Sequence, residues 1–580
     1  MPLKAVIYNS FASAWVRFEN PSEVIQTSKL DAVVSLLEYV NRCAVEFKKY
    51  AVGFIPYDAS PAFDSAMTVK ENAKSELPLL WFALFDDYKA IEIPRTTTAN
   101  NYFSDWTPSV SETQYNSSIA KIKDYIKAGD TYQVNYTLRQ HASFKGEPWE
   151  LFCELANSQR SRNCAFIETD DFAICSASPE LFFTLKDGLI TSKPMKGTTQ
   201  RGLTLAEDKK QAEWLHNSRK NRSENIMIVD MIRNDIGRIA QAGTVKIPKV
   251  FEVEKYPTVW QMTSTVHAKT NKSVPDIMKA LFPCASITGA PKVRTMVIIS
   301  ELEATPRGIY TGSIGFIAPD NSAQFNVAIR TVVINKKTSV AEYGVGGGIV
   351  WDSTNSDEYN ECLIKTKFLS NPIPDFSILE SILWTPDNGY FLLEYHLERM
   401  RKSAEYFDYP FDAEKIKLLL NKEVTQPSEP LKVRLLLNIE GKVSVERSKL
   451  GQFKNTISVA ISGVPVRKNN PFLCHKTTNR KLYEDIKSKH SSYDEVILWN
   501  EDGEVTEAIT SNIVIKIGAN LYTPPISCGL LGGTFRQYLL DKGEIAEKII
   551  KLDELKSSDE IYFINSIRKF RLAVIDWALQ

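Results

Sequence analysis

Apolar residues follow two different periods along the first third of the chain. From Ala5 to about Trp106, short runs of β-branched and aromatic residues alternate with turns, which predicts a β-rich beginning. From Ser111 to Lys127 apolar residues recur at helical spacing, and Gly129 follows as a stop signal. Between Cys164 and Ile190 the pattern predicts three strands joined by tight turns. Strand-rich and helical stretches therefore occupy separate parts of the sequence.

The middle of the chain carries two predicted helices in succession and then a pair of strands. The helix over Leu205–Lys220 is polar, whereas Asn221–Ile239 is apolar around most of its circumference, which predicts a buried helix. A strand pair follows at Ile309–Ile317 and Ala323–Ile334. The spacing of apolar residues predicts a further helix over Asp352–Leu369.

Asn371-Pro-Ile-Pro-Asp375 is the most linker-like point of the sequence, because two prolines follow a predicted helix end. Beyond it the pattern restarts, with predicted strands near 376–384, 432–437, 456–461 and 494–499 and a helix from Glu394 to Phe407. A chain of 580 residues is too long for one ordinary core. We therefore expect a first domain over residues 1–370, divided into a β-rich part (1–105) and a catalytic part (106–370), a linker at 371–375 and a second domain over 376–580.

Composition and charge favour a globular enzyme that acts on a small molecule. The chain is 43% hydrophobic and 24% charged, and its 70 basic residues balance its 70 acidic ones, which disfavours nucleic-acid and membrane binding. Apolar runs stop far short of the roughly 18 residues that span a bilayer. The eight cysteines include no Cys-x-x-Cys pair, which favours reduced thiols in a cytoplasm and argues against a zinc site.

Lys196 is the first candidate for catalysis, in a predicted turn between Pro194 and Gly197. An unperturbed lysine with a pKa of about 10.4 is neutral in only about one molecule in 2,500 at pH 7. Desolvation or nearby cations could lower that pKa by roughly three units and make Lys196 a nucleophile. Glu180, at a Ser-Pro-Glu turn of the same strand region, could pass a proton to or from a leaving hydroxyl. A solvated lysine and an exposed turn glutamate are the alternatives.

Residues between 283 and 370 are suited to an anionic substrate and a metal. Thr288-Gly-Ala-Pro-Lys292 is a glycine turn into a helix, which would present backbone N–H groups to an anion. Arg330 could hold a carboxylate through two hydrogen bonds. Glu358 and Glu361 share one face of a predicted helix, and with Glu224 they are hard oxygen ligands suited to Mg²⁺. Ordinary surface acidic residues are the alternative.

The second half carries three parts of a pyridoxal phosphate site. Lys476 precedes a predicted helix, Glu507 follows a turn, and Gly529–Arg536 is a glycine turn into a helix that would suit a phosphate. A lysine for the Schiff base, a carboxylate for the ring nitrogen and an anion-binding helix start are what such a site requires.

The first 370 residues resemble the chorismate-utilising enzymes, which include the synthase subunits for anthranilate and aminodeoxychorismate and the isochorismate and salicylate synthases. The motifs that carry the resemblance are Gly129–Asn135, Ser178–Glu180, Pro194–Thr198, Glu224–Arg238, Gly289–Lys292, Tyr310, Arg330, Gly346–Gly348 and Asp352–Glu361. The resemblance implies an α+β fold in which large antiparallel sheets form a sandwich with flanking helices. It also implies chorismate as the substrate.

Lys196 separates the branches of this family, because aminodeoxychorismate synthases typically have lysine in the Pro-x-Lys-Gly-Thr motif and anthranilate synthases have alanine. The resemblance implies that Lys196 attacks the chorismate ring, that Glu180 helps the 4-hydroxyl to leave, and that ammonia then displaces the lysine. The implied Mg²⁺ ligands are Glu224 and Glu361, with Glu358 close by. The implied substrate contacts are Thr288, Gly289, Tyr310, Arg330, Gly346, Gly348 and Lys365, of which Tyr310, Arg330 and the two glycine amides hold the enolpyruvyl carboxylate.

Two positions depart from the common family pattern. Asn221 stands where many relatives have another carboxylate, and Gln261 stands where many have a histidine. The outer shell of the metal site and one contact with the substrate ring are therefore expected to differ.

Residues 376–580 are similar to the class IV aminotransferases, and specifically to 4-amino-4-deoxychorismate lyases, which implies a two-subdomain α/β fold. In that pattern Lys476 is the Schiff-base lysine and Glu507 meets the pyridine nitrogen. Arg399, Asn512 and Thr534 complete the implied contacts with the cofactor, and Arg399 and Thr534 hold its phosphate. A lyase would remove pyruvate and leave 4-aminobenzoate, a folate precursor.

Three alternatives stay open at this point. The second half could be a branched-chain or D-amino-acid type of transaminase, or an inactive docking domain. The first half could instead be an anthranilate synthase component. Since the sequence has no Gly-x-Cys-x-Gly nucleophile motif, we expect a separate glutamine amidotransferase subunit to supply ammonia.

Overall fold

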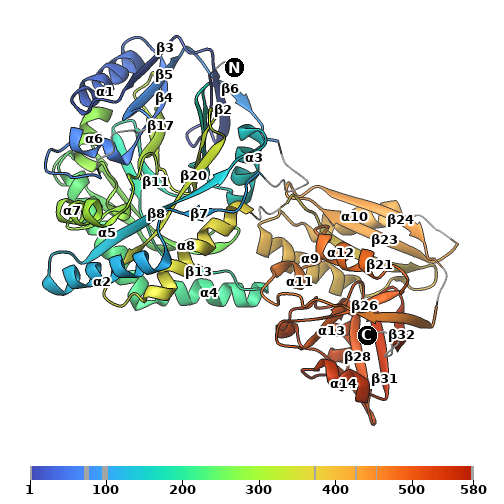
Figure 1. Cartoon of the computed structure of the whole chain (residues 1–580). Coiled ribbons are helices and arrows are strands. Elements are labelled where there is room, and N and C mark those ends of the chain that lie inside the picture. The colour runs from blue at the N-terminus through green and yellow to red at the C-terminus, as the bar shows by residue number, and fades with distance from the viewer. Residues whose placement is uncertain are drawn as a thin grey trace. The chain divides into compact units, whose positions relative to one another are not determined.

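The computed structural model describes residues 3–70, 77–94, 102–370, 374–424, 428–451 and 454–575. The chain forms two compact units, one built from Met1–Gln200 and Ala212–Pro374 and the other from Arg201–Gln211 and Asp375–Gln580 (Figure 1). Residues 371–373 of the predicted linker lie outside the described residues.

The first unit contains two ten-stranded sheets in which the paired strands are antiparallel. The first sheet comprises β1 (Lys4–Asn9), β2 (Ala14–Glu19), β6 (Lys89–Ile91), β7 (Thr107–Pro108), β8 (Gln133–Ser143), β9 (Ala165–Glu168), β10 (Phe172–Ser176), β16 (Gly289–Ala290), β19 (Thr331–Asn335) and β20 (Val340–Ile349). Its strand order is β16-β8-β20-β19-β10-β9-β1-β2-β6, with β7 also paired to β8.

The second sheet of this unit has the order β13-β15-β12-β11-β18-β17-β4-β5-β3, with β14 also paired to β15. Its strands are β3 (Glu23–Thr27), β4 (Tyr50–Ile55), β5 (Leu80–Phe85), β11 (Leu181–Lys186), β12 (Leu189–Lys193), β13 (Met195–Gln200), β14 (Lys246–Lys255), β15 (Val259–Lys269), β17 (Ser313–Ile317) and β18 (Ala323–Val327).

An apolar cluster fills the space between the two sheets. It joins Phe18 of β2 to Phe54 and Trp81, and the last two rings stack with centroids 5.7 Å apart. The outer face of the second sheet packs with α1 (Leu30–Val45), α5 (Arg219–Gly237) and α6 (Val274–Leu281). The outer face of the first sheet packs with α2 (Glu112–Ala128), α3 (Pro148–Gln159), α7 (Lys292–Leu302) and α8 (Asn355–Ser370). This arrangement confirms the expected sandwich with flanking helices.

Several elements agree with the sequence pattern and others differ for clear reasons. Helix α2 begins at a capping box of Ser111 and Gln114 and ends at Gly129, whose φ of 81° suits glycine. The predicted strand Ala323–Ile334 is in fact two strands, β18 in the second sheet and β19 in the first. The chain crosses between the sheets at Arg330, which has a φ of 49°. A run of apolar residues cannot reveal such a crossing.

Two helices also differ from expectation. The β-rich beginning contains the 16-residue helix α1, which its sequence had not indicated. Helix α5 begins earlier than predicted, at Arg219 after the N-cap Ser218, and a separate helix α4 (Leu205–Asn217) precedes it. Only one face of α5 is buried, because Ile226 on the other face is 42% exposed. The prediction of a helix buried all round was therefore wrong.

The second unit contains a four-stranded sheet and an eight-stranded sheet. The smaller sheet has the order β22-β21-β23-β24, from β21 (Ile378–Thr385), β22 (Gly389–Tyr390), β23 (Leu431–Leu437) and β24 (Val443–Lys449). The larger sheet, β27-β26-β25-β32-β31-β28-β29-β30, contains parallel pairs. Its strands are β25 (Thr456–Ile461), β26 (Glu495–Trp499), β27 (Val505–Ala508), β28 (Asn512–Ile517), β29 (Asn520–Thr523), β30 (Ala546–Glu547), β31 (Glu560–Asn565) and β32 (Lys569–Ile575).

The helices of the second unit are α9 (Leu393–Phe407), α10 (Ala413–Glu423), α11 (Pro471–Cys474), α12 (Lys481–Lys489), α13 (Thr534–Asp541) and α14 (Leu552–Ser557). The unit also takes in Arg201–Gln211 from much earlier in the chain. Arg201 forms a buried ion pair with Asp208 at 2.6 Å, and its guanidinium lies 4.3 Å from the ring centre of Tyr406. Nothing in the sequence pattern had assigned this segment to the second unit.

Among the described residues, no helix combines the length and the apolar character needed to cross a membrane. The eight cysteines are all free thiols, and seven of them are buried.

Candidate active sites

The strand β20 lacks side chains along one stretch, because Gly344, Gly346, Gly347 and Gly348 follow within five residues. A side-chain carbon on Gly348 would lie 2.3 Å from Nε2 of Gln133 and 3.3 Å from Nζ of Lys196. Only glycine leaves room for both groups at this point. The strand thus brings Lys196 and Gln133 together against one backbone position.

Lys196 and the buried Glu180 lie close enough for each to affect the pKa of the other. Lys196 is not in a turn as predicted but in the strand β13, and Glu180 is buried rather than exposed, at 3%. Burial lowers the pKa of Lys196, against the opposing effect of Glu180 and Glu224. Burial raises the pKa of Glu180 to about 7, although Ser286 and Lys196 favour its charged form. Oε1 of Glu180 is buried and has no hydrogen-bond partner.

The residues around Lys196 hold its backbone in place. Gly197 has a φ of 94°, and a side-chain carbon there would lie 2.9 Å from Cβ of Asn221. Gln261 donates a hydrogen bond from Nε2 to the Gly197 carbonyl at 2.9 Å and accepts one from the Thr198 hydroxyl at 2.8 Å. The two residues that depart from the family pattern therefore both support the strand that carries Lys196.

The predicted metal ligands lie around the same glycine-rich strand, but their carboxylates are not gathered around one point where three of them could bind a metal ion. A side-chain carbon on Gly347 would lie 2.7 Å from Oε2 of Glu358. Glu361 forms an ion pair with Lys365 at 2.6 Å, and Lys365 also donates to the Gly346 carbonyl at 2.8 Å. Within the described part of the chain, no three His, Cys, Asp or Glu side chains are placed to hold a metal ion. Burial raises the pKa of Glu358, and the neighbouring Glu361 raises it further.

Glu224 lies in the second turn of α5, not in the first turn as predicted, because the helix starts at Arg219. Its carboxylate is close enough to Lys196 to affect the pKa of that lysine.

Thr288 and Gly289 lie at the edge of the first sheet, beside Gln133. Gly289 has a φ of 144°, and a side-chain carbon there would lie 2.0 Å from the Gln133 carbonyl oxygen. The backbone N–H of Asn135 donates to the Thr288 carbonyl at 2.8 Å. Helix α7 follows as predicted, but Lys292 at its start is paired with Asp235 at 2.8 Å.

Tyr310 and Arg330 lie in loops and not within strands as predicted. Tyr310 is 7% exposed, and a side-chain carbon on Gly344 would lie 2.1 Å from Cγ of its ring. Arg330 donates a short hydrogen bond to Gln159, and burial lowers its pKa. Both residues are therefore held by the protein before a substrate arrives.

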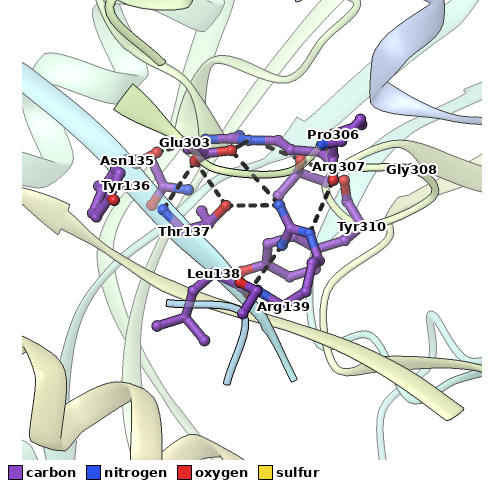
Figure 2. Close-up of polar contacts among 12 residues, drawn as sticks. Asn135, Tyr136, Thr137, Leu138, Arg139, Glu303, Pro306, Arg307, Gly308 and Tyr310 are labelled. Atoms are coloured by element: carbon purple, nitrogen blue, oxygen red, sulfur yellow. Dashed lines mark hydrogen bonds and ion pairs between the residues drawn. The ribbon is translucent and has the colours of Figure 1, made fainter. Parts of the chain in front are cut away.

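A network of buried charges lies next to Tyr310 (Figure 2). Glu303 accepts hydrogen bonds from the Thr137 backbone at 2.9 Å and from Arg307 at 2.8 and 3.0 Å. Arg139 lies with its guanidinium 4.8 Å from the ring centre of Tyr310. Both arginines are 1% exposed. No sequence pattern had indicated this network.

A cavity of about 490 Å³ lies on the opposite side of β13 from Lys196. Its lining includes Met195, Lys193 and Tyr256. Because successive strand residues point to opposite faces, Met195 faces this cavity while Lys196 faces Gly348. None of the predicted site residues lines it.

In the second unit, Lys476 lies between α11 and α12 beside a small cavity. Burial and the charges of Arg399 and Arg480 lower the pKa of Lys476 to about 8. Burial raises the pKa of Glu507 to about 7. Glu507 accepts hydrogen bonds from the Tyr483 hydroxyl at 2.8 Å and from the Leu531 backbone N–H at 3.2 Å.

Arg399 is held by Glu380, a fully buried carboxylate of β21. Arg399 donates to it at 2.8 and 2.6 Å, and His396 contacts it at 2.6 Å. Burial would raise the pKa of Glu380, but the neighbouring Arg399 and His396 hold it at about 2. Arg399 also donates to the Gly532 carbonyl at 3.1 Å, which places it at the turn before Thr534.

Thr534 is the first residue of α13, and its hydroxyl lies 3.2 Å from Nε2 of His396. Asn512 donates to the Leu531 carbonyl at 2.8 Å and packs against Gly533. Arg399, Asn512 and Thr534 thus converge on one glycine turn at a helix start, which is suited to a phosphate.

Sequence reasoning gave no role to several of these groups. Glu380 interrupts an otherwise apolar strand, and a charged residue there is a signal that it has a buried partner. The sequence offered no comparable signal for Tyr483, His396 or the side chain of Gln133.

Comparison with known proteins identifies a family for each half of the chain. Residues 6–371 match the family model described as chorismate binding enzyme, and residues 377–573 match the model of amino-transferase class IV. The chain is 42% identical over 265 residues to aminodeoxychorismate synthase component 1 of Escherichia coli, covering 45% of this chain and 58% of the relative. It is 33% identical over 377 residues to the protein of that name from Klebsiella aerogenes, covering 59% of this chain and 83% of the relative.

A solved structure supports the fold of the first unit. Anthranilate synthase component I from Streptococcus pneumoniae superposes with a TM-score of 0.52 at 25% sequence identity, over 64% of this chain and 91% of that one. The chain spans only 58% and 61% of the first two curated relatives that it matches. The match over residues 6–371 covers well over half of the chain, and on that basis the protein belongs to the chorismate binding enzyme family.

Proposed function

We propose that the protein converts chorismate and ammonia to 4-amino-4-deoxychorismate in its first unit and then to 4-aminobenzoate and pyruvate in its second. The observation that carries the proposal is the buried pair of Lys196 and Glu180 beside the glycine strand. An amine and a carboxylic acid whose pKa values are shifted toward neutrality by a shared site can act as nucleophile and acid at the same pH. The Escherichia coli and Klebsiella aerogenes relatives are aminodeoxychorismate synthase components, which supports the first of the two reactions.

In the first reaction, the neutral amine of Lys196 forms a bond to the chorismate ring as the bond to the 4-hydroxyl breaks. Glu180 gives its proton to the departing oxygen, which leaves as water. Ammonia then forms a bond to the carbon that lost the hydroxyl, and Lys196 leaves with its electron pair. The net change is the replacement of a hydroxyl by an amine, with water as the second product.

The carboxylates of the substrate require cations and donors. Arg330, Tyr310 and the amides near Gly346 and Gly348 would hold the enolpyruvyl carboxylate, and Lys365, Thr288 and Gly289 would lie around the rest of the substrate. Mg²⁺ commonly uses one or two protein carboxylates and completes its shell with water and substrate oxygens. Glu361 and Glu224 fit that need. Burial raises the pKa of Glu358, the charge of Glu361 raises it further, and a divalent cation nearby would favour the charged form of both carboxylates.

In the second reaction, pyridoxal phosphate would supply an electron sink for the carbon that bears the new amine. The donor set fits this cofactor, since a lysine with a pKa of about 8, the carboxyl of Glu507 and the turn at Thr534 all face one site. Lys476 would take the proton from the carbon bearing nitrogen. The ring becomes aromatic as pyruvate leaves. Arg399 and Asn512 would keep the phosphate end in place.

We also propose a cytoplasmic setting and a separate glutamine amidotransferase subunit as the ammonia source. Free thiols in all eight cysteines suit a reducing compartment. The relatives named component 1 favour a second component.

Product analysis of the chain with chorismate, ammonium, Mg²⁺ and pyridoxal phosphate tests the proposal. We expect 4-aminobenzoate and pyruvate by mass spectrometry. Lys196→Ala should lower the rate roughly thousand-fold or more, because it removes the nucleophile. Lys193→Ala is the matched control, since Lys193 ends β12, three residues before Lys196 in the chain, and lines the cavity behind Lys196. Anthranilate as the wild-type product would contradict the proposal.

The pH dependence of the first step should report Glu180. A carboxylic acid with a raised pKa is protonated below about pH 7 and loses its proton above it, so the rate should fall as pH rises through that value. The assay measures formation of the Lys196 adduct by intact-protein mass spectrometry in the absence of ammonia. The protonation of ammonia then makes no contribution to the pH profile. Glu180→Gln should be about 10² to 10⁴ times slower and should lack this limb. An unchanged limb in the variant would assign the titration to another group.

Lys476→Ala separates the two reactions. The variant should convert chorismate to aminodeoxychorismate at the wild-type rate and stop there, because the first unit retains all of its own groups. It should also lose the pyridoxal phosphate absorbance of the wild-type chain. Lys481→Ala, on the exposed side of α12, is the control. A wild-type chain that itself stops at aminodeoxychorismate would refute the lyase assignment, and exchange of amino groups with a 2-oxo acid would favour a transaminase.

A further inference from the structure

The ring of Tyr310 lies across one cross-strand pair of the first sheet. Gly344 of β20 is paired directly with Arg139 of β8. The Tyr310 ring occupies the space that a side chain on Gly344 would fill, and the Arg139 guanidinium lies 4.8 Å from its centre. Arg139 and Gly344 therefore fix the position of this ring from the two strands on which it lies.

Arg139 is itself held by the backbone around it. Its Nε donates to the Pro306 carbonyl at 3.2 Å, and its Nη1 donates to the Leu138 carbonyl at 3.1 Å. Its Nη2 donates to the Thr137 hydroxyl at 3.0 Å, whereas the nearest Glu303 oxygen is 3.6 Å away. The charge of Arg139 is thus only loosely paired, and its flat face is left for the ring of Tyr310.

The turn that leads to Tyr310 is fixed by the other members of the network. The Gly308 backbone N–H donates to Asp58 at 2.8 Å, and Arg307 donates to the carbonyl oxygens of Asn135 and Ile287 at 2.6 and 2.9 Å. Glu303 holds Arg307 through two hydrogen bonds (Figure 2). The segment that precedes the ring is therefore tied to β8 at Asn135, to Ile287 and to Asp58.

The hydroxyl of Tyr310 has no hydrogen-bond partner among the described residues, although the side chain is buried. Burial raises the pKa of Tyr310 well above its usual value despite the charges of Arg139 and Arg307, so the side chain is a neutral hydroxyl that can donate a hydrogen bond. A cluster of buried charges adds little to the stability of a fold, because removing the charges from water costs free energy. Burying them to hold one unpartnered donor in a fixed place is consistent with a ligand-binding role.

We propose that Arg139 is a positioning residue for the anionic substrate, acting through Tyr310. Arg139 holds the Tyr310 ring in place before the substrate binds. The Tyr310 hydroxyl then meets the substrate carboxylate without the entropy cost of ordering a side chain on binding. This inference rests on the proposed function of the first unit, because it takes chorismate as the anion. It predicts an effect on substrate binding and little effect on the chemical step.

Arg139→Lys keeps the charge but removes the flat face and the forked donors. We expect the KM for chorismate to rise roughly three- to tenfold, with kcat within about twofold of the wild type. His141→Gln is the matched control, because His141 lies on the same strand and pairs with Glu342 at 3.1 Å without contacting Tyr310. Its KM should stay within about twofold of the wild type.

A double-mutant cycle separates this role from a general loss of structure. Tyr310→Phe alone should also raise KM, and Arg139→Lys combined with Tyr310→Phe should be no worse than Tyr310→Phe, since Arg139 then has no hydroxyl to position. If Arg139→Lys does not fold, Thr137→Val removes the hydroxyl that Arg139 contacts, together with its hydrogen bond to Glu303, and leaves Arg139 itself in place. It should raise KM to a smaller extent, and only while the Tyr310 hydroxyl is present.

The outcomes distinguish this inference from the function on which it rests. If the wild-type chain neither binds nor converts chorismate, the proposed function and the inference both fail. If the wild-type chain converts chorismate but the effects of the two substitutions multiply, or if Arg139→Lys lowers kcat and leaves KM unchanged, only the role of Arg139 is refuted.

Discussion

The first unit depends on the glycine-rich strand β20, around which the candidate site residues lie. Tyr310 lies over Gly344, Lys365 bonds to the carbonyl of Gly346, and Glu358 lies over Gly347. Lys196 and Gln133 meet at Gly348. These groups come from four parts of the chain, namely the Tyr310 loop, α8, β13 and β8. A methyl group at Gly344, Gly347 or Gly348 would displace the group that lies there. The ten-residue pairing of β20 with β8 keeps this bare backbone straight and in register.

The same physical principle governs both units. Burial disfavours the charged form of an isolated group, so a lysine and a glutamate placed in one dry site shift toward a shared neutral range. In the first unit the pKa of Lys196 is lowered and that of Glu180 is raised to about 7. In the second unit Lys476 reaches about 8 and Glu507 about 7. Each unit therefore holds a lysine that loses its proton more readily than a lysine in water.

The sequence was sufficient for the overall α+β architecture and for the motifs, because helix caps, turn residues and apolar periods are local signals. The order of Glu180, Lys196 and the glycine-rich strand along the chain could be read from the motifs. Their closeness in space could not. Contacts such as Arg139 over Tyr310 join residues 171 positions apart in the chain. The crossing at Arg330 and the inclusion of Arg201–Gln211 in the second unit depend on long-range packing, which periodicity cannot report. The sequence could not decide whether Glu180 is a site residue or an exposed turn glutamate, because burial depends on long-range packing; in the structure it is enclosed.

The central claim is that two complete sites on one chain act in sequence on one substrate. Mixing the Lys196→Ala and Lys476→Ala chains tests it most directly, because each lacks one essential lysine and retains the other unit intact. Supplied with chorismate, ammonium, Mg²⁺ and pyridoxal phosphate, neither variant alone should form 4-aminobenzoate, and the mixture should form it after a lag in which aminodeoxychorismate accumulates. Formation of 4-aminobenzoate by either variant alone, or its absence from the mixture while aminodeoxychorismate accumulates, would contradict the account.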